Sequence, residues 1–125
     1  MLSLTKRGIT MATVKAFSDL EQSRKLAEIL PLKSADMHYG EYSHNFVEYP
    51  IPNNESDYEC GYNGQPAWSL AALLSVLPNG IVMNKDSQNG RYHFSSTHAG
   101  TYVTTDNPID ACVAMIEKLH ELKIL

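Results

Sequence analysis

The sequence predicts an α+β fold with three helices and an antiparallel sheet of three strands, or of four if one further short strand joins it. Three observations predict this class. Three segments carry apolar residues at helical spacing, three consecutive short segments resemble strands separated by glycine-containing loops, and the 125 residues fit a single domain. The expected order of elements is α-(loop/β)-α-β-β-β-α.

The first helix is expected directly after Ser18, because Ser18-Asp19-Leu20-Glu21 has the pattern of a capping box. Apolar residues at helical spacing then continue to Leu30. Pro31 should end the helix, since the residue before a proline is disfavoured in α geometry. Residues 1–17 are expected to be a loose leader, so that the single α+β domain covers residues 18–125.

Residues 34–66 form the least regular part of the sequence, because proline, glycine and asparagine recur there as turn formers. One short strand is expected at residues 45–49, where Phe46 alternates with polar neighbours. This acidic, tyrosine-rich segment is otherwise expected to be irregular. An irregular segment of this length inside a compact domain is often functional or mobile.

The second helix is expected from Pro66 to Leu77, because proline suits the first turn of a helix. Apolar residues occupy nearly its whole circumference. A short helix of that kind is usually enclosed by the rest of the domain. We therefore expect it to be the central, buried helix.

Three strands are expected next, at residues 81–85, 91–96 and 101–105, and each connection contains a glycine suited to a hairpin loop. The last helix should begin with Asn107 as its cap and Pro108 in its first position. Five residues form its apolar stripe: Ile109, Cys112, Val113, Ile116 and Leu119.

The chain is acidic, with a net charge of −4, and its charge is unevenly distributed. Residues 1–33 hold six basic and three acidic residues, whereas residues 34–84 hold six acidic residues and no Lys or Arg. A polyphosphate backbone would be repelled by this middle part, so a nucleic-acid partner is disfavoured. The acidic segment itself is interpreted as a solvated loop in preference to a cation site.

The composition also bears on location. No run approaches 18 consecutive apolar residues, so no membrane span is expected, and the N-terminus lacks the continuous apolar core of a signal peptide. Two cysteines, Cys60 and Cys112, do not make a disulfide framework. These features predict a cytoplasmic protein.

From residue 66 onward, the expected order of helix, three strands and helix is similar to that of double-stranded RNA-binding domains, which read duplex shape and phosphates. That family uses basic residues near the start of its last helix. Here this position reads Asn107-Pro108-Ile109-Asp110, which is acidic. The similarity is one of topology alone, and the charge argues against the function.

Tyrosines gather in the irregular segment. Tyrosine and tryptophan are enriched at protein interfaces, because they combine an apolar ring with a polar group. The candidate interaction surface consists of Tyr39, Tyr42, Tyr58, Tyr62 and Trp68, which would then be partly exposed as one patch. The alternative is that these rings hold an irregular loop onto the domain.

A metal site or a cysteine nucleophile is the second hypothesis. Zinc sites use three or four His or Cys ligands, and His38, His44 and Cys60 are the weak candidates. The sequence has no CxxC or HExxH motif, and isolated surface histidines are the favoured explanation of the pattern. A nucleophile at Cys60 would need a base that only the tertiary structure can supply. Without GxGxxG, Walker or GxSxG motifs, no catalytic residue and no cofactor is expected.

Three segments carry a resemblance at the level of sequence: Ser34-Ala35-Asp36-Met37, Pro66-Ala67-Trp68-Ser69-Leu70 and Asn107-Pro108-Ile109-Asp110-Ala111-Cys112-Val113. They resemble a family of small uncharacterised proteins of phages, prophages and mobile elements in Bacteroides-type bacteria. The resemblance covers about residues 19–125. It implies a cytoplasmic accessory protein of a mobile element and brings no catalytic residues.

The sequence therefore favours a non-enzymatic module that binds another protein, with a small enzyme or metal protein as the alternative. The identity of that protein partner stays open. A strand edge left unpaired, for example at residues 101–105, would also allow homo-oligomers to form.

Overall fold

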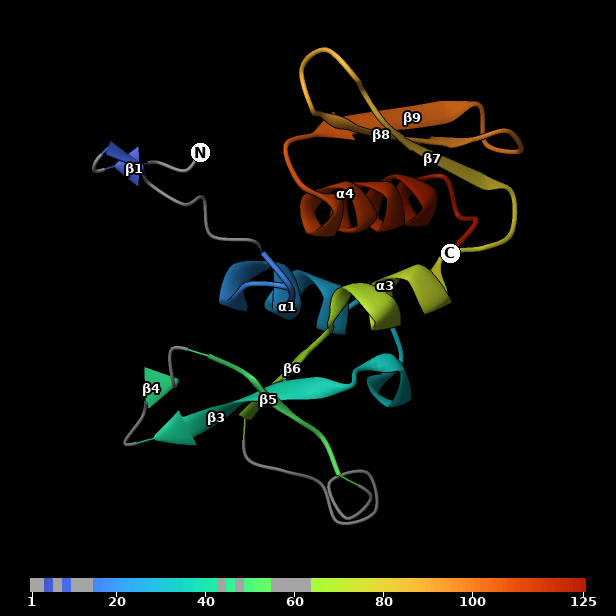
Figure 1. The fold of residues 1–125 in the computed structure, drawn as a ribbon. Helices are drawn as coiled ribbons and strands as arrows, with labels where there is room; N and C mark the ends of the chain where they lie inside the picture. The colour runs from blue at the N-terminus through green and yellow to red at the C-terminus, as the bar shows by residue number, and fades with distance from the viewer. Residues whose placement is uncertain (1–3, 6–7, 10–14, 43–44, 47–48, 55–63) are drawn as a thin grey trace.

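The computed structural model describes residues 4–5, 8–9, 15–42, 45–46, 49–54 and 64–125, and Figure 1 shows their arrangement. Within this part of the chain the fold is α+β, with three α-helices and two main antiparallel sheets, which confirms the predicted class. The helices are α1 (Leu20–Ala27), α3 (Leu70–Val76) and α4 (Pro108–Glu121). Shorter elements are β1 (Leu4–Thr5), β2 (Gly8–Ile9) and the 3₁₀ turn η1 (Leu32–Ser34).

The C-terminal sheet is the predicted meander. It consists of β7 (Ile81–Lys85), β8 (Tyr92–Ser96) and β9 (Thr101–Thr105), paired in that order. One row across the three strands is Met83, Phe94 and Val103. Since residues directly opposite one another share a face of a sheet, this row lies on a single face. Phe94 and Val103 are buried, so this is the face that packs on the core.

The second sheet surrounds β3 (Met37–Tyr42), which pairs antiparallel with β6 (Gly64–Ala67), β5 (Ile51–Pro52) and β4 (Asn45–Phe46). The sequence predicted a strand near β4 and missed the other three. Residues 64–67 are a strand, so the expected start of the second helix at Pro66 is wrong. Within the described residues β6 pairs with β3 alone, and proline is tolerated on such an edge strand.

Gly64, at the start of β6, allows this pairing. Its φ is +150°, and a Cβ atom built on it would collide with the carbonyl oxygen of Tyr39. Only glycine permits such a close approach of the two backbones. The helix that follows β6 therefore begins at Leu70, where the side chain of Ser69 accepts a hydrogen bond from the amide of Ala72.

The capping box of α1 lies one residue later than expected. Asp19, rather than Ser18, is the N-cap: its carboxylate accepts from the amide of Gln22, and the Gln22 side chain accepts from the amide of Asp19. Ser18 is buried, and its hydroxyl oxygen accepts a hydrogen bond from the Trp68 amide at 3.0 Å. The tertiary contact takes the hydroxyl away from the capping role, and Asp19 supplies it instead.

Tertiary contacts also begin before Ser18. The carbonyl of Ala16 accepts from the amide of Leu70, Phe17 forms an antiparallel bridge with Ser69, and Lys15 lies 2.8 Å from Asp110. Residues 15–17 therefore contact the residues that begin α3 and α4. Among the described residues, every helix is too short or too polar to cross a bilayer.

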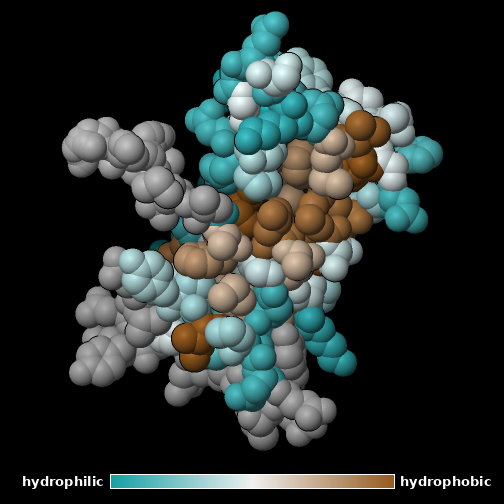
Figure 2. Space-filling model, viewed as in Figure 1, coloured by the Kyte–Doolittle hydropathy of each residue, from teal (hydrophilic) through white to brown (hydrophobic). Residues whose placement is uncertain are grey.

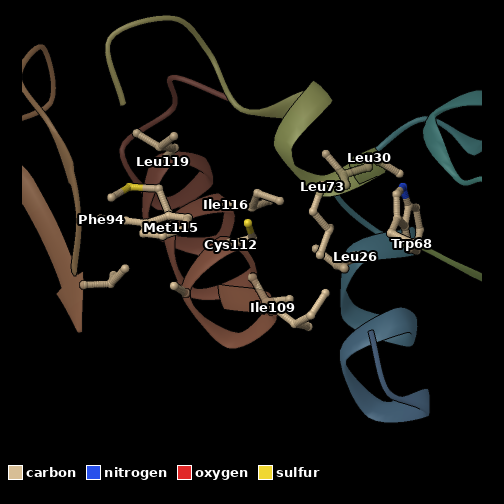
Figure 3. Packing of buried hydrophobic residues seen from close by; sticks show 14 of the residues in the cluster. Leu26, Leu30, Trp68, Leu73, Phe94, Ile109, Cys112, Met115, Ile116 and Leu119 are labelled. Carbon is tan, nitrogen blue, oxygen red and sulfur yellow. The ribbon is translucent and has the colours of Figure 1, made fainter. Parts of the chain in front are cut away.

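Helix α4 is the central helix of the structure. It lies between the C-terminal sheet on one side and α1 with α3 on the other (Figure 1). Met115 lies beside Phe94, whereas Ile109 and Ile116 face Leu26 and Leu73 (Figure 3). The predicted stripe of α4 is buried, and so are Ala111 and Met115, because the helix is covered on two sides.

The expectation that the second helix would be central is therefore wrong. Only Ala72 and Leu73 of α3 are buried, and Leu74 is 38% exposed. Helix α3 has seven residues and packs on α4 at the side of the core. The described part of the chain leaves Ala71 and Leu74 of this helix exposed.

Candidate interaction surface

Two of the aromatic residues expected at the surface are in the interior. Trp68 is 0% exposed and Tyr39 is 3% exposed, so the expectation of a partly exposed patch is wrong for both. The side chain of Tyr42 and the whole of Tyr58 and Tyr62 lie outside the described residues. Tyr39 and Trp68 instead agree with the alternative interpretation, in which these rings hold the segment onto the domain.

Their hydrogen bonds explain this burial. The indole Nε1 of Trp68 donates to the Ser34 hydroxyl at 2.9 Å, and the Tyr39 hydroxyl donates to the carbonyl of Ser18 at 2.7 Å. The Ser18 and Ser23 hydroxyls lie 2.7 Å apart. Buried Tyr and Trp need such partners for their polar atoms. Burial also raises the pKa of Tyr39 to about 12, which keeps its hydroxyl protonated as a donor.

The weak metal candidates are not brought together by anything that the structure describes. His38 is buried, and its Nδ1 lies 2.6 Å from the side-chain oxygen of Asn53. His44 and Cys60 lie outside the described residues. In the described ranges, no three His, Cys, Asp or Glu side chains are grouped as a metal ion would require. Cys112 is buried in the core, where desolvation raises its thiol pKa to about 12.

Two segments singled out in the sequence, residues 34–37 and 66–70, join distant parts of the fold. Asp36 accepts hydrogen bonds from both the amide and the hydroxyl of Ser69, so it ties the start of β3 to the start of α3. Charge-assisted bonds of this kind are stronger than neutral ones. These motif residues therefore have a structural role that needs no catalytic explanation.

Asp110 performs the same kind of task at the start of α4. Its carboxylate accepts from Lys15 at 2.8 Å, from Gln22 at 2.8 Å and from Asn107 at 2.7 Å. We call these four residues the Asp110 cluster. It joins the segment before α1, α1 itself and the cap of α4. Asn107 also accepts from the Asp110 amide, which confirms the predicted cap.

The Asp110 cluster predicts a loss of stability in acid. Burial acts to raise the pKa of Asp110, but hydrogen bonds from Lys15, Gln22 and Asn107 outweigh burial and hold that pKa below its ordinary value. The folded-state pKa thus lies below the unfolded one, so the stabilisation is complete above about pH 4 and disappears as the pH falls through the folded pKa. Asp110→Asn should flatten this acid limb in urea unfolding measured from about pH 2 to 7.

Asp106→Asn is the matched control, because Asp106 is close by and far more exposed. Its removal should leave the acid limb of the stability curve in place. An unchanged acid limb in Asp110→Asn would contradict the role assigned to the cluster.

The order α3, β7, β8, β9, α4 agrees with the topology expected from the sequence. The position where RNA-binding domains of that topology carry basic residues is here occupied by the Asp110 cluster, whose one cation, Lys15, is bound to two carboxylates. A positive surface for phosphates is not formed by these residues. That the protein does not bind nucleic acid stays a prediction.

The described surface is hollowed between α3 and β7. One cavity of about 230 Å³ is lined by Asn84, Lys85 and six apolar or aromatic residues: Leu70, Leu74, Met83, Tyr92, Phe94 and Pro108. An adjoining cavity of about 260 Å³ shares Leu74 and Met83 with it and extends past the end of α3. We call the two together the α3–β7 groove. Figure 2 shows apolar residues gathered over α3 and β7.

The groove lies beside an open strand edge. Within the described residues β7 pairs with β8 alone, and its side chains from Val82 to Lys85 are exposed. Val82 is 51% exposed and Met83 50%, on opposite faces of the strand. A natural edge strand is usually shortened, charged or covered, and this one ends in a single charge at Lys85.

Sequence reasoning missed this groove because it assigned α3 to the interior. One signal was available: residues 61–84 contain no Asp, Glu, Lys or Arg. Depletion of charge marks the centre of an interface as well as a core. Only the placement of α3 distinguishes these two explanations.

Comparison of the chain with models of protein families, with curated proteins and with solved structures finds no match.

Proposed function

We propose that this protein is a small, non-enzymatic protein-interaction module that binds an extended, uncharged segment of a partner protein along β7. The observation that carries the proposal is the uncovered side of α3, an uncharged helix that exposes Leu74 beside the open edge of β7. Apolar surface beside an open strand edge is the arrangement used in recognition by strand addition.

The partner's segment would form main-chain hydrogen bonds with β7 and place one apolar side chain in the α3–β7 groove. The groove suits a side chain of Met or Leu size, because its lining is apolar except at Asn84 and Lys85. The resemblance of three segments to mobile-element proteins supports an accessory role in the cytoplasm. The tyrosine-rich segment is not needed for this mode of binding.

An end-capped seven-residue peptide that alternates Thr with Met or Leu is a suitable probe. We expect it to shift the amide resonances of β7 and to slow hydrogen exchange at Met83. Met83→Glu should weaken this binding at least about tenfold, because a carboxylate would lie in the apolar groove. Val82→Glu is the matched control, since Val82 is equally exposed on the other face of the same strand.

A second control is the same peptide with proline at its centre, which lacks a main-chain donor and should not pair with a strand edge. Equal binding of the proline peptide, equal effects of the two Glu variants, or no binding to β7 at concentrations where the chain is monomeric would each contradict the proposal. Far-UV circular dichroism establishes that both variants are folded.

A further inference from the structure

The geometry points to a second copy of this chain as the occupant of the α3–β7 groove. Two β7 strands pair antiparallel across a two-fold axis at Met83, and the two three-stranded sheets become one sheet of six strands. This inference rests on the proposed function and names its partner. A strand that pairs with its own copy in antiparallel orientation forms a closed, isologous interface.

The main chain of β7 has the required donors and acceptors. The amide of Asp86 donates to the carbonyl of Arg91 across the β7–β8 ladder at 2.8 Å. Because the hydrogen-bonding groups of successive residues point to alternate sides of a strand, those of Asn84 and Val82 also point to β8. The groups of Ile81, Met83 and Lys85 then point to the open edge, and Met83 can pair with Met83 of the second copy.

The positions of the charged residues fit this register. It places Val82 opposite Asn84 of the second copy and Ile81 opposite Lys85, so the two lysines lie at opposite ends of the interface. Like charges directly opposite one another destabilise a sheet, and this register has none. Residues 81–84 carry no charge, so a charged strand that paired with this edge would find no complementary charge there.

The uncovered side of α3 becomes covered in the same assembly. Paired strands keep their faces, so the α3 helices of both copies lie on the same side of the joined sheet. The exposed residues Ala71, Leu74 and Ser75 are small or apolar, and none carries a charge. The two Met83 side chains meet on this side, next to Leu74, where they line both cavities of the groove.

The other open edge is less suited to self-pairing. Strand β9, where the sequence suggested an unpaired edge, pairs with β8 alone within the described residues. Its Val103 is already buried against α4, and its exposed Tyr102 lies on the opposite face of the sheet. Neither cavity of the α3–β7 groove is lined by a residue of β9, so β7 is the edge that the geometry selects.

Sedimentation velocity of the full chain over a range of concentrations tests the inference. We expect a monomer–dimer equilibrium that Met83→Glu weakens at least about tenfold, because it sets two carboxylates opposite each other. Val82→Glu should leave the equilibrium nearly unchanged, since that carboxylate faces Asn84 on the other side of the sheet. In the unmodified chain, amide exchange at Met83 should slow as the concentration rises, whatever the folding of the variants.

A dimer that Met83→Glu leaves intact, or a dimer without concentration-dependent protection at β7, overturns the inference. A chain that stays monomeric at all concentrations also overturns it. If such a monomer still binds the alternating peptide along β7, the proposed function survives and only the second copy is excluded. If it binds no peptide either, both fail.

Discussion

Replacing Trp68 with alanine is expected to lower the free energy of unfolding by about 3–5 kcal/mol, the range for deleting a large buried aromatic side chain. Trp68 is fully buried, belongs to the main hydrophobic cluster and donates to Ser34. A loss of this size is a large part of the roughly 5–15 kcal/mol that stabilises a typical domain. Urea unfolding followed by far-UV circular dichroism measures it without relying on tryptophan fluorescence.

Trp68→Phe is the matched variant, because it retains most of the apolar contact and removes the Nε1 donor. We expect it to cost about 1–2 kcal/mol, from the lost hydrogen bond and a small void. Nearly equal costs for the two variants, or a cost below about 1 kcal/mol for alanine, would contradict the placement of Trp68 in the core.

Asp36→Ala is the second substitution with a large expected effect, a loss of about 2–3 kcal/mol. The carboxylate of Asp36 accepts from the Ser69 amide at 2.8 Å and also from the Ser69 hydroxyl. Its removal deprives the first turn of α3 of a partner that holds the helix to β3. The same urea unfolding experiment measures the change.

A double-mutant cycle with Ser69→Ala separates this contact from other effects of the two substitutions. Ser69→Ala alone removes the cap of α3 and should cost about 1 kcal/mol or more. Because the two side chains share one contact, the double variant should cost less than the sum of the singles, by roughly 1 kcal/mol. Strict additivity would mean that the Asp36–Ser69 contact contributes nothing.

The C-terminal part of the fold follows from local signals. Asn107, Pro108 and the apolar stripe define α4 by short-range rules, and glycine-containing loops separate β7, β8 and β9. Each of these signals acts within a few residues of the chain, so the sequence alone predicts these elements closely.

The second sheet depended on contacts between residues far apart in the chain. Met37 of β3 pairs with Ala67 of β6, and Tyr39 of β3 pairs with Gln65 of β6. The four residues of β6, Gly-Gln-Pro-Ala, lack the alternating pattern of a half-buried strand. Pro66 carried a local signal for a helix start, which the pairing with β3 overrode. The Ser18 capping pattern failed similarly, because the buried hydroxyl is used by Trp68 and Asp19 is left to cap α1.

The candidate site divides in the same manner. The sequence by itself determined that Tyr39 and Trp68 are amphipathic aromatics and that residues 61–84 are uncharged, and both features suit a core and an interface equally. Only the tertiary structure decided between the two: it enclosed both rings and left Leu74 and Met83 exposed beside a strand edge that no other described strand pairs with. The physical reason is that burial depends on which elements pack against a surface. The apolar pattern of α3 predicted a central helix, but α4 is the helix that other elements cover on two sides.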